Sequence, residues 1–99
     1  MKHIRLYDNY IYVDPTYQYI RYKIDNKANM ILRFNQITND AKLLDIDTNT
    51  FTEFISSIET LKSMEKSDYL KKPGSFWRMA TEEEIEQFKI TEYTNKYNI

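Results

Sequence analysis

Apolar residues recur at helical spacing between Thr50 and Lys66, and this stretch predicts the central helix of the protein. The recurring residues are Phe51, Phe54, Ile55, Ile58 and Leu61. Thr50 and Glu53 have the spacing of a capping box, in which each side chain bonds the backbone N–H of the other residue, so we expect the helix to begin at Thr50. Because a helix of this length is only marginally stable alone in water, its apolar stripe needs a partner surface.

The first half of the chain, rich in tyrosine and β-branched residues, predicts a sheet as that partner surface. Its four expected strands are His3–Tyr7, Tyr10–Val13, Thr16–Ile24 and Met30–Phe34. Asp8-Asn9 tolerates a tight turn between the first two strands, and Asp14-Pro15 interrupts the ladder before the third. Ala41–Ile46 fits either a fifth strand or the segment that leads into the central helix.

The third expected strand alternates between two kinds of side chain. Those expected to face the central helix are Gln18, Ile20, Tyr22 and Ile24. The opposite face collects aromatic and basic side chains, and the next strand extends it. We call this surface the Tyr/Arg face; it consists of Tyr17, Tyr19, Arg21, Lys23 and Arg33, and we expect it to be exposed.

A turn separates the central helix from the last elements. Pro73-Gly74 suits a type II turn, in which the second central residue has a positive φ. Phe76–Met79 follows as a short extended segment, and we expect Trp77 within it to be buried because tryptophan most often anchors a core.

Thr81 and Glu84 form a second capping-box pair and predict a short C-terminal helix over Thr81–Ile90. The tail after it fits either an edge strand or a segment without fixed structure. Together these elements predict an α+β fold: an antiparallel sheet of four or five strands, one long helix packed on one face, and this short helix. A chain of 99 residues is long enough for one core, so we expect a single domain over residues 1–99.

The composition excludes several classes of site. With no cysteine and one histidine, His3, the chain offers neither a thiolate nucleophile nor a His- or Cys-rich metal site. Its single glycine, Gly74, excludes glycine-rich phosphate-binding loops. No run is apolar enough for a membrane span or for the core of a signal peptide, so we expect a cytoplasmic protein without membrane contact.

The acidic residues suggest two candidate chemistries, and we expect neither. Asp45, Asp47 and Asn49 alternate as the ligands of a calcium loop do. Such a loop needs glycine where this chain has Thr50, and a bidentate glutamate where it has Ser56. The glutamates at 82, 83, 84 and 86 suit the positive end of the helix dipole rather than acid–base catalysis. We therefore predict no catalytic residue, no metal site and no cofactor.

The Tyr/Arg face is the main candidate for a binding surface. Aromatic rings on a sheet stack on bases while Arg and Lys contact phosphate, but tyrosine and arginine also dominate protein-binding hot spots, and tyrosine simply fits exposed strands. The net charge is −1, with seven Lys/Arg against four Asp/Glu in residues 1–42 and seven against eleven in residues 43–99. This distribution favours a basic sheet surface beside acidic helices.

The segment Phe76–Phe88, FWRMATEEEIEQF, resembles the closing Arg-x-Ala-Thr-x-Glu-Glu-Ile segment of many small accessory proteins encoded by bacteriophages and related mobile elements. The segment carries no catalytic residue to transfer. The resemblance implies an inhibitor that binds a host or defence-system protein, in some cases by mimicking the charge of nucleic acid.

We therefore expect a non-enzymatic, phage-type inhibitor that occludes a host or defence macromolecule in the host-cell cytoplasm. The expected partner-binding residues are those of the Tyr/Arg face. The alternative is a small single-stranded nucleic-acid or nucleotide binder that uses the same face.

Overall fold

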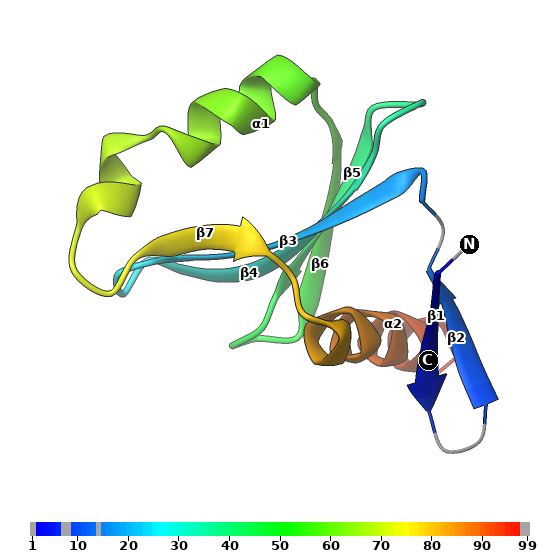
Figure 1. Ribbon diagram of the computed structural model, residues 1–99. Coiled ribbons are helices and arrows are strands. Elements are labelled where there is room, and N and C mark those ends of the chain that lie inside the picture. Colours follow the sequence, from blue (N-terminus) through cyan, green and yellow to red (C-terminus); the bar gives the residue numbers. More distant parts are fainter. Residues whose placement is uncertain (1, 7–8, 14, 98–99) are drawn as a thin grey trace.

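The structure is a computed structural model that describes residues 2–6, 9–13 and 15–97, with side chains for residues 15–95. The described residues form seven strands and two α-helices, which are labelled in Figure 1. The strands are β1 (Lys2–Leu6), β2 (Asn9–Val13), β3 (Tyr17–Ile24), β4 (Ala28–Asn35), β5 (Asp40–Asp45), β6 (Thr50–Ile55) and β7 (Phe76–Met79). The helices are α1 (Ile58–Glu65) and α2 (Glu82–Tyr97), and a 3₁₀ turn, η1, covers Asp68–Lys71.

Five strands form one antiparallel sheet in the order β6-β5-β4-β3-β7. Strands β3 to β6 follow one another as a meander, and β7 returns to pair with β3, from Ile20 opposite Met79 to Lys23 opposite Phe76. Among the described residues, strands β1 and β2 pair only with each other, in a separate two-stranded sheet. The predicted α+β class is therefore confirmed, but the prediction that the first half of the chain alone forms the sheet is wrong.

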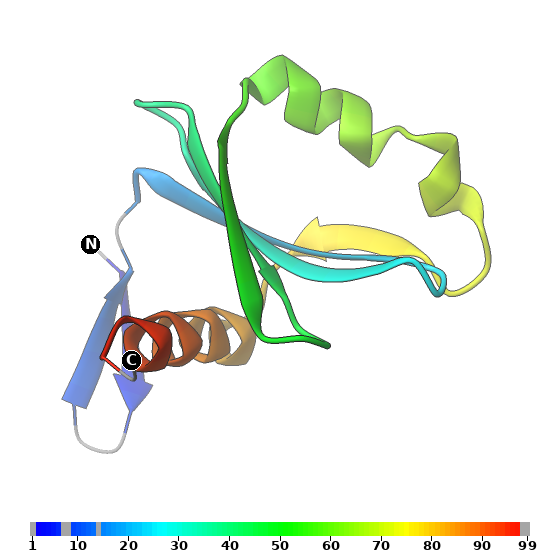
Figure 2. The same ribbon diagram turned by 180° about the vertical axis from the view of Figure 1, so that it is seen from behind.

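The two helices lie on opposite faces of the five-stranded sheet, as Figures 1 and 2 show. On the α1 face the buried side chains are Ile20, Tyr22, Leu32, Phe34, Ala41 and Leu61. On the α2 face they are Tyr19, Ile31, Leu44 and Phe88. Because successive side chains of a strand point to opposite faces, the neighbours Ile31 and Leu32 enter different clusters. Strands β3 and β4 are therefore buried on both sides.

The predicted central helix over Thr50–Lys66 is wrong in its first part. Residues 50–55 form strand β6, which pairs along its whole length with β5. The helix begins only after Ser57, whose side chain accepts a hydrogen bond from the backbone N–H of Thr60. Thr50 is therefore not a helix cap. The physical reason is the β-branched and aromatic content of Thr50–Ile55, which suits a strand that has a neighbour to pair with.

The second helix begins where predicted and ends later. The Thr81 N–H bonds Glu84 Oε1 at 2.8 Å, and the Glu84 N–H bonds Thr81 Oγ1 at 3.2 Å, so the predicted capping box is confirmed. Helix α2 has 16 residues and α1 has eight, the reverse of the predicted lengths. Residues 91–97, predicted as an edge strand or a segment without fixed structure, continue α2.

The turns agree with the sequence. Gly74 has a φ of +82°, and the Ser75 N–H bonds the Lys72 carbonyl at 3.0 Å, as a type II turn requires. Asp45–Asn49 is a polar turn in which Asp45 Oδ1 accepts from the Asp47 N–H at 3.0 Å, and Ala41–Ile46 proves to be largely strand β5. Trp77 is half-buried and stacks on Tyr22 with ring centroids 5.1 Å apart.

Part of the N-terminal prediction lies outside the described residues. The pairing of β1 with β2 supports the predicted hairpin, but Tyr7, Asp8 and Asp14 and the side chain of His3 are not described. In the described part of the chain, no helix is both long enough and apolar enough to cross a bilayer.

Replacing Phe88 by alanine should destabilise the protein by about 3–5 kcal/mol, because the ring is fully buried and its loss leaves a cavity between α2 and the sheet. Ile90→Ala is the control: Ile90 lies on the same helix with 52% of its surface exposed and should change stability by less than about 0.5 kcal/mol. Urea unfolding measures both free energies. Equal losses at the two positions would contradict the packing of α2 on the sheet.

Candidate functional site

Most of the Tyr/Arg face lies beneath α2 instead of facing solvent. Tyr19 is only 3% exposed, and its ring meets the Phe88 ring edge-on with centroids 5.6 Å apart. Burial raises the pKa of the Tyr19 hydroxyl, although neighbouring Arg33 opposes this. The prediction that Tyr19 is exposed is therefore wrong, because the C-terminal helix covers this face.

Arg21 is held by a carboxylate at the start of α2. Its side chain is 13% exposed, and its Nε lies 3.2 Å from Glu84 Oε2. Arg78 of β7 also binds Glu84, through Nη1 at 2.7 Å and Nη2 at 2.9 Å. The hydrogen bonds from Arg78 and from Thr81 lower the pKa of Glu84 to about 2. Glu84 therefore both caps α2 and fixes it to two strands.

A second carboxylate on α2 bridges two basic side chains of the sheet. Arg33 Nη1 lies 3.0 Å from Glu92 Oε1, and Lys42 Nζ lies 2.9 Å from Glu92 Oε2. Burial alone would raise the pKa of Glu92, but the hydrogen bonds from Lys42 and Arg33 outweigh it and lower the pKa. Arg33 and Lys42 stand directly opposite each other on β4 and β5, where like charges destabilise the pair unless a carboxylate lies between them.

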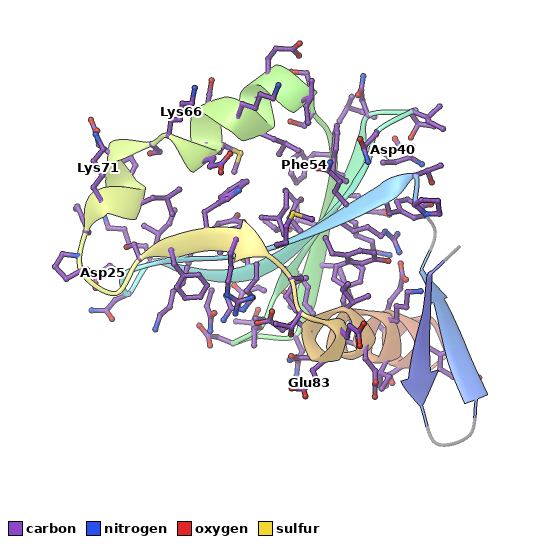
Figure 3. All side chains as sticks on the ribbon, in the orientation of Figure 1. Asp25, Asp40, Phe54, Lys66, Lys71 and Glu83 are labelled. Carbon is purple, nitrogen blue, oxygen red and sulfur yellow. The ribbon has the colours of Figure 1, made fainter. Side chains whose placement is uncertain are left out.

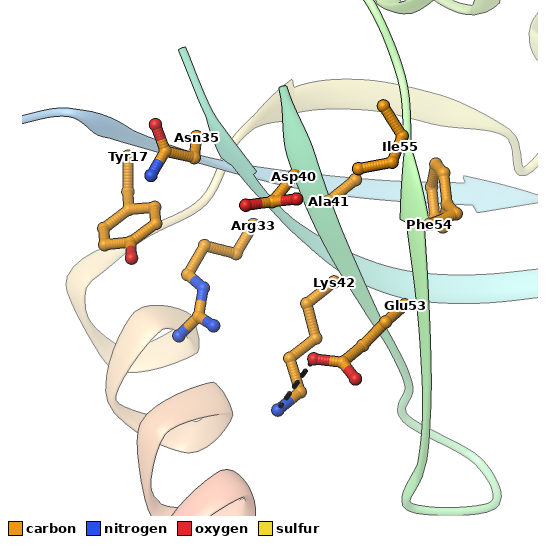
Figure 4. A pocket seen from close by; sticks show the side chains of 9 residues that line it. All are labelled: Tyr17, Arg33, Asn35, Asp40, Ala41, Lys42, Glu53, Phe54 and Ile55. Carbon is orange, nitrogen blue, oxygen red and sulfur yellow. Dashed lines mark ion pairs between the residues drawn. The ribbon is translucent and has the colours of Figure 1, made fainter. Parts of the chain in front are cut away.

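Beside this bridge the same face of the sheet opens into a pocket of about 510 Å³, which we call the Tyr17 pocket (Figure 4). It is lined by Tyr17, Arg33, Asn35, Asp40, Ala41, Lys42, Glu53, Phe54 and Ile55. The Arg33 guanidinium lies 4.9 Å from the centre of the Tyr17 ring, and Lys42 Nζ lies 3.8 Å from Glu53 Oε1. Ile55 is 72% exposed at its rim.

The structure divides the predicted site residues. Tyr17 and Arg33 lie together in the Tyr17 pocket. Tyr19 is core, Arg21 belongs to the Glu84 cluster, and Lys23 lies at the far end of β3 beside the polar turn at 25–29. The sequence reasoning missed Lys42, Glu53 and Ile55. For Lys42 a signal did exist. If residues 41–46 are taken as a strand and not as the approach to the central helix, Ala41 and Lys42 point to opposite faces of the sheet.

The strongest charges of the pocket are paired: Arg33 and Lys42 both bind Glu92. The pKa of Glu92 is lowered, whereas a carboxyl group that acts as a general acid needs a raised pKa, near the working pH. Among the described residues, no group of three His, Cys, Asp or Glu side chains is arranged to hold a metal ion. No protein-family model, curated protein or solved structure matches the chain.

The free energy of unfolding should decrease as the pH is lowered and Glu84 and Glu92 become protonated. Both have a lower pKa in the folded state than the ordinary value of 4.5, so their contribution is present above about 4.5 and is lost as the pH falls toward the folded pKa, about 2 for Glu84. Glu84→Gln should therefore be less stable than the wild type at pH 7 and lose less stability below pH 4.5.

The control for this experiment is Glu83→Gln, which removes an exposed charge from the same helical turn. Urea unfolding between pH 7 and pH 2 gives the comparison. If Glu84→Gln and Glu83→Gln followed the same pH dependence as the wild type, the ion pairs of Glu84 would not stabilise the fold.

Proposed function

We propose that this protein is a non-enzymatic binding protein that occludes a protein partner through the Tyr17 pocket. The observation that carries the proposal is the position of Ile55, an exposed aliphatic side chain at the rim of a pocket lined by Tyr17 and Arg33. Protein interfaces combine an apolar anchor with tyrosine and arginine in this way, surrounded by polar groups.

The mixed charge of the pocket favours a protein partner over nucleic acid. Arg33 and Lys42 share Glu92, and the acidic residues Asp40 and Glu53 line the same pocket. A nucleic-acid site requires basic side chains that are free to neutralise phosphates. The alternative of a single-stranded nucleic-acid or nucleotide binder also loses its stacking platform, because Tyr19 lies under α2.

The class of partner follows from the resemblance of Phe76–Phe88 to small phage and mobile-element proteins. On this proposal the partner is a host or defence-system protein in the host-cell cytoplasm, and binding blocks its working surface. In this fold the same segment supplies β7 and the start of α2, and none of its residues lines the pocket.

The protein should show no measurable affinity for generic single-stranded DNA or RNA at about 150 mM salt. Nucleic-acid binding depends on released counterions, whereas the net charge here is −1 and the basic residues of the Tyr17 pocket, Arg33 and Lys42, are paired with Glu92. Fluorescence anisotropy with labelled oligonucleotides measures this. Sub-micromolar binding that Tyr17→Ala abolishes would replace the protein-partner proposal with the nucleic-acid one.

Affinity capture from host lysate, with mass spectrometry to identify the partner, tests the proposal directly. Ile55→Lys should weaken capture of the identified partner at least about tenfold, as the loss of one hot-spot side chain does. Ile90→Lys places the same substitution on another exposed isoleucine and should leave capture unchanged. Equal capture by both variants would show that the Tyr17 pocket is not the contact surface.

A further inference from the structure

The face of the sheet opposite the Tyr17 pocket carries a groove between α1 and the outer strand β7. Two adjacent cavities, of about 240 and 210 Å³, make up the groove, and Trp77 lines both. Ile58 of α1 and Met79 of β7 line the first, and Met64 and Leu70 line the second. Figure 3 shows the side chains that project from α1 and from the sheet into the space between them.

Strand β7 borders this groove with an unpaired edge. It is the last strand of its sheet, and no strand among the described residues pairs with its outer side. The Ala80 N–H bonds the Tyr19 carbonyl at 2.9 Å, which fixes the phase of the ladder between β7 and β3. Hydrogen-bonded and non-hydrogen-bonded pairs alternate along an antiparallel ladder. The backbone of Arg78, two residues before Ala80, therefore bonds β3, whereas the N–H groups of Trp77 and Met79 point away from β3 toward the open edge.

Part of this edge is already engaged by the protein itself. The Met79 carbonyl accepts a hydrogen bond from Arg78 Nη1 at 3.2 Å. The outward N–H groups of Trp77 and Met79 are donors of the kind that an added strand would satisfy. The edge thus presents a short row of donors beside the two cavities that Trp77 lines.

The charges of the groove differ between its two ends. At the Met79 end, Lys62 and Glu65 both line the cavity and offset each other. At the other end, Lys27 Nζ and Lys72 Nζ lie 5.5 and 5.6 Å from the centre of the Tyr69 ring, which lines the second cavity. The end near Tyr69 is therefore basic and suits an acidic ligand group.

We propose that this groove binds an extended, acidic segment of a partner protein, which adds as a strand antiparallel to β7. Its alternate apolar side chains enter the two cavities on either side of Trp77, since successive strand residues point to opposite faces. An antiparallel segment runs from Met79 toward Phe76, so the acidic residues follow the apolar ones and lie near Lys27 and Lys72. All pairs in the five-stranded sheet are antiparallel, which is the geometry that the added strand continues.

The proposal does not depend on the function proposed for the Tyr17 pocket, because the two sites lie on opposite faces of the sheet. Ile55→Lys should leave peptide binding at the groove unchanged. Substitutions in the groove should likewise leave capture through the Tyr17 pocket unchanged. The two proposals therefore fail or succeed separately.

Selection from a displayed library of random linear peptides tests the groove. Enriched peptides should carry apolar residues at alternate positions followed by Asp or Glu. Met79→Pro removes the outward N–H donor at that position and should weaken their binding roughly tenfold, the effect of about one lost hydrogen bond at a site. Proline is tolerated on an edge strand when its missing N–H faces outward, and Met79→Ala, which keeps the donor, is the matched control.

A second arm keeps the test valid if Met79→Pro fails to fold. Two N-methylated forms of an enriched peptide are compared. N-methylation of the alternate residues whose N–H groups face β7 should abolish binding to the wild type, whereas N-methylation of the other alternate residues should not. The double substitution Lys27→Gln with Lys72→Gln should weaken binding of the acidic peptide. It should not weaken binding of the same peptide with Asn and Gln in place of Asp and Glu. Absence of enrichment, equal binding by Met79→Pro and Met79→Ala, insensitivity to N-methylation, or a dimer of this chain formed through β7 would each overturn the proposal.

Discussion

Phe88 lies fully buried where the last helix meets the sheet, and its ring makes edge-on contacts with Tyr19 of β3 and Phe51 of β6. Those two strands stand on either side of β4 and β5 in the sheet. One aromatic side chain therefore spans the meander and holds α2 against it. Glu84 and Glu92 lie on either side of Phe88 along the helix. Their carboxylates form ion pairs with basic side chains of β3, β4, β5 and β7. Apolar attraction is non-directional, so the charges fix which part of the helix meets which strand.

Local signals predicted the Pro73-Gly74 turn, the polar turn at 45–49 and the start of α2, and they failed for the start of α1, where one pattern crossed an element boundary. Phe51, Phe54, Ile55 and Ile58 have helical spacing, yet the first three belong to β6 and the last to α1. A spacing of three and four residues arises by chance when an alternating strand runs into a helix. The positive φ of Asn49, at 55°, allows the tight hairpin that brings β6 back along β5. Pairing with β5 then outweighs any helical tendency of this segment.

The sequence predicted which residues share the Tyr/Arg face, but not that α2 covers most of it. Alternation correctly placed Tyr17, Tyr19, Arg21 and Arg33 on one face of the sheet. What covers that face is α2, whose Glu92 binds Arg33 from 59 positions further along the chain, so the pattern of the strands alone does not reveal the cover. A signal for the cover did exist, because Glu84, Phe88 and Glu92 repeat at four-residue spacing and so share one side of α2. Matching that acid–aromatic–acid row to a sheet face rich in arginine would have predicted the docking of α2.

The order of the chain also determines when this face is protected during synthesis. Strands β3 to β6 are joined by short turns and pair with their sequence neighbours, so the meander needs little loop closure. Helix α2, by contrast, spans residues 82–97 and reaches the ribosome exit after all strands of the sheet. Until it emerges, the side of the nascent meander that carries Tyr19, Ile31 and Leu44 is an open apolar surface. Three charged side chains, Arg21, Arg33 and Lys42, lie on the same face, so this surface is not continuously apolar before the helix arrives.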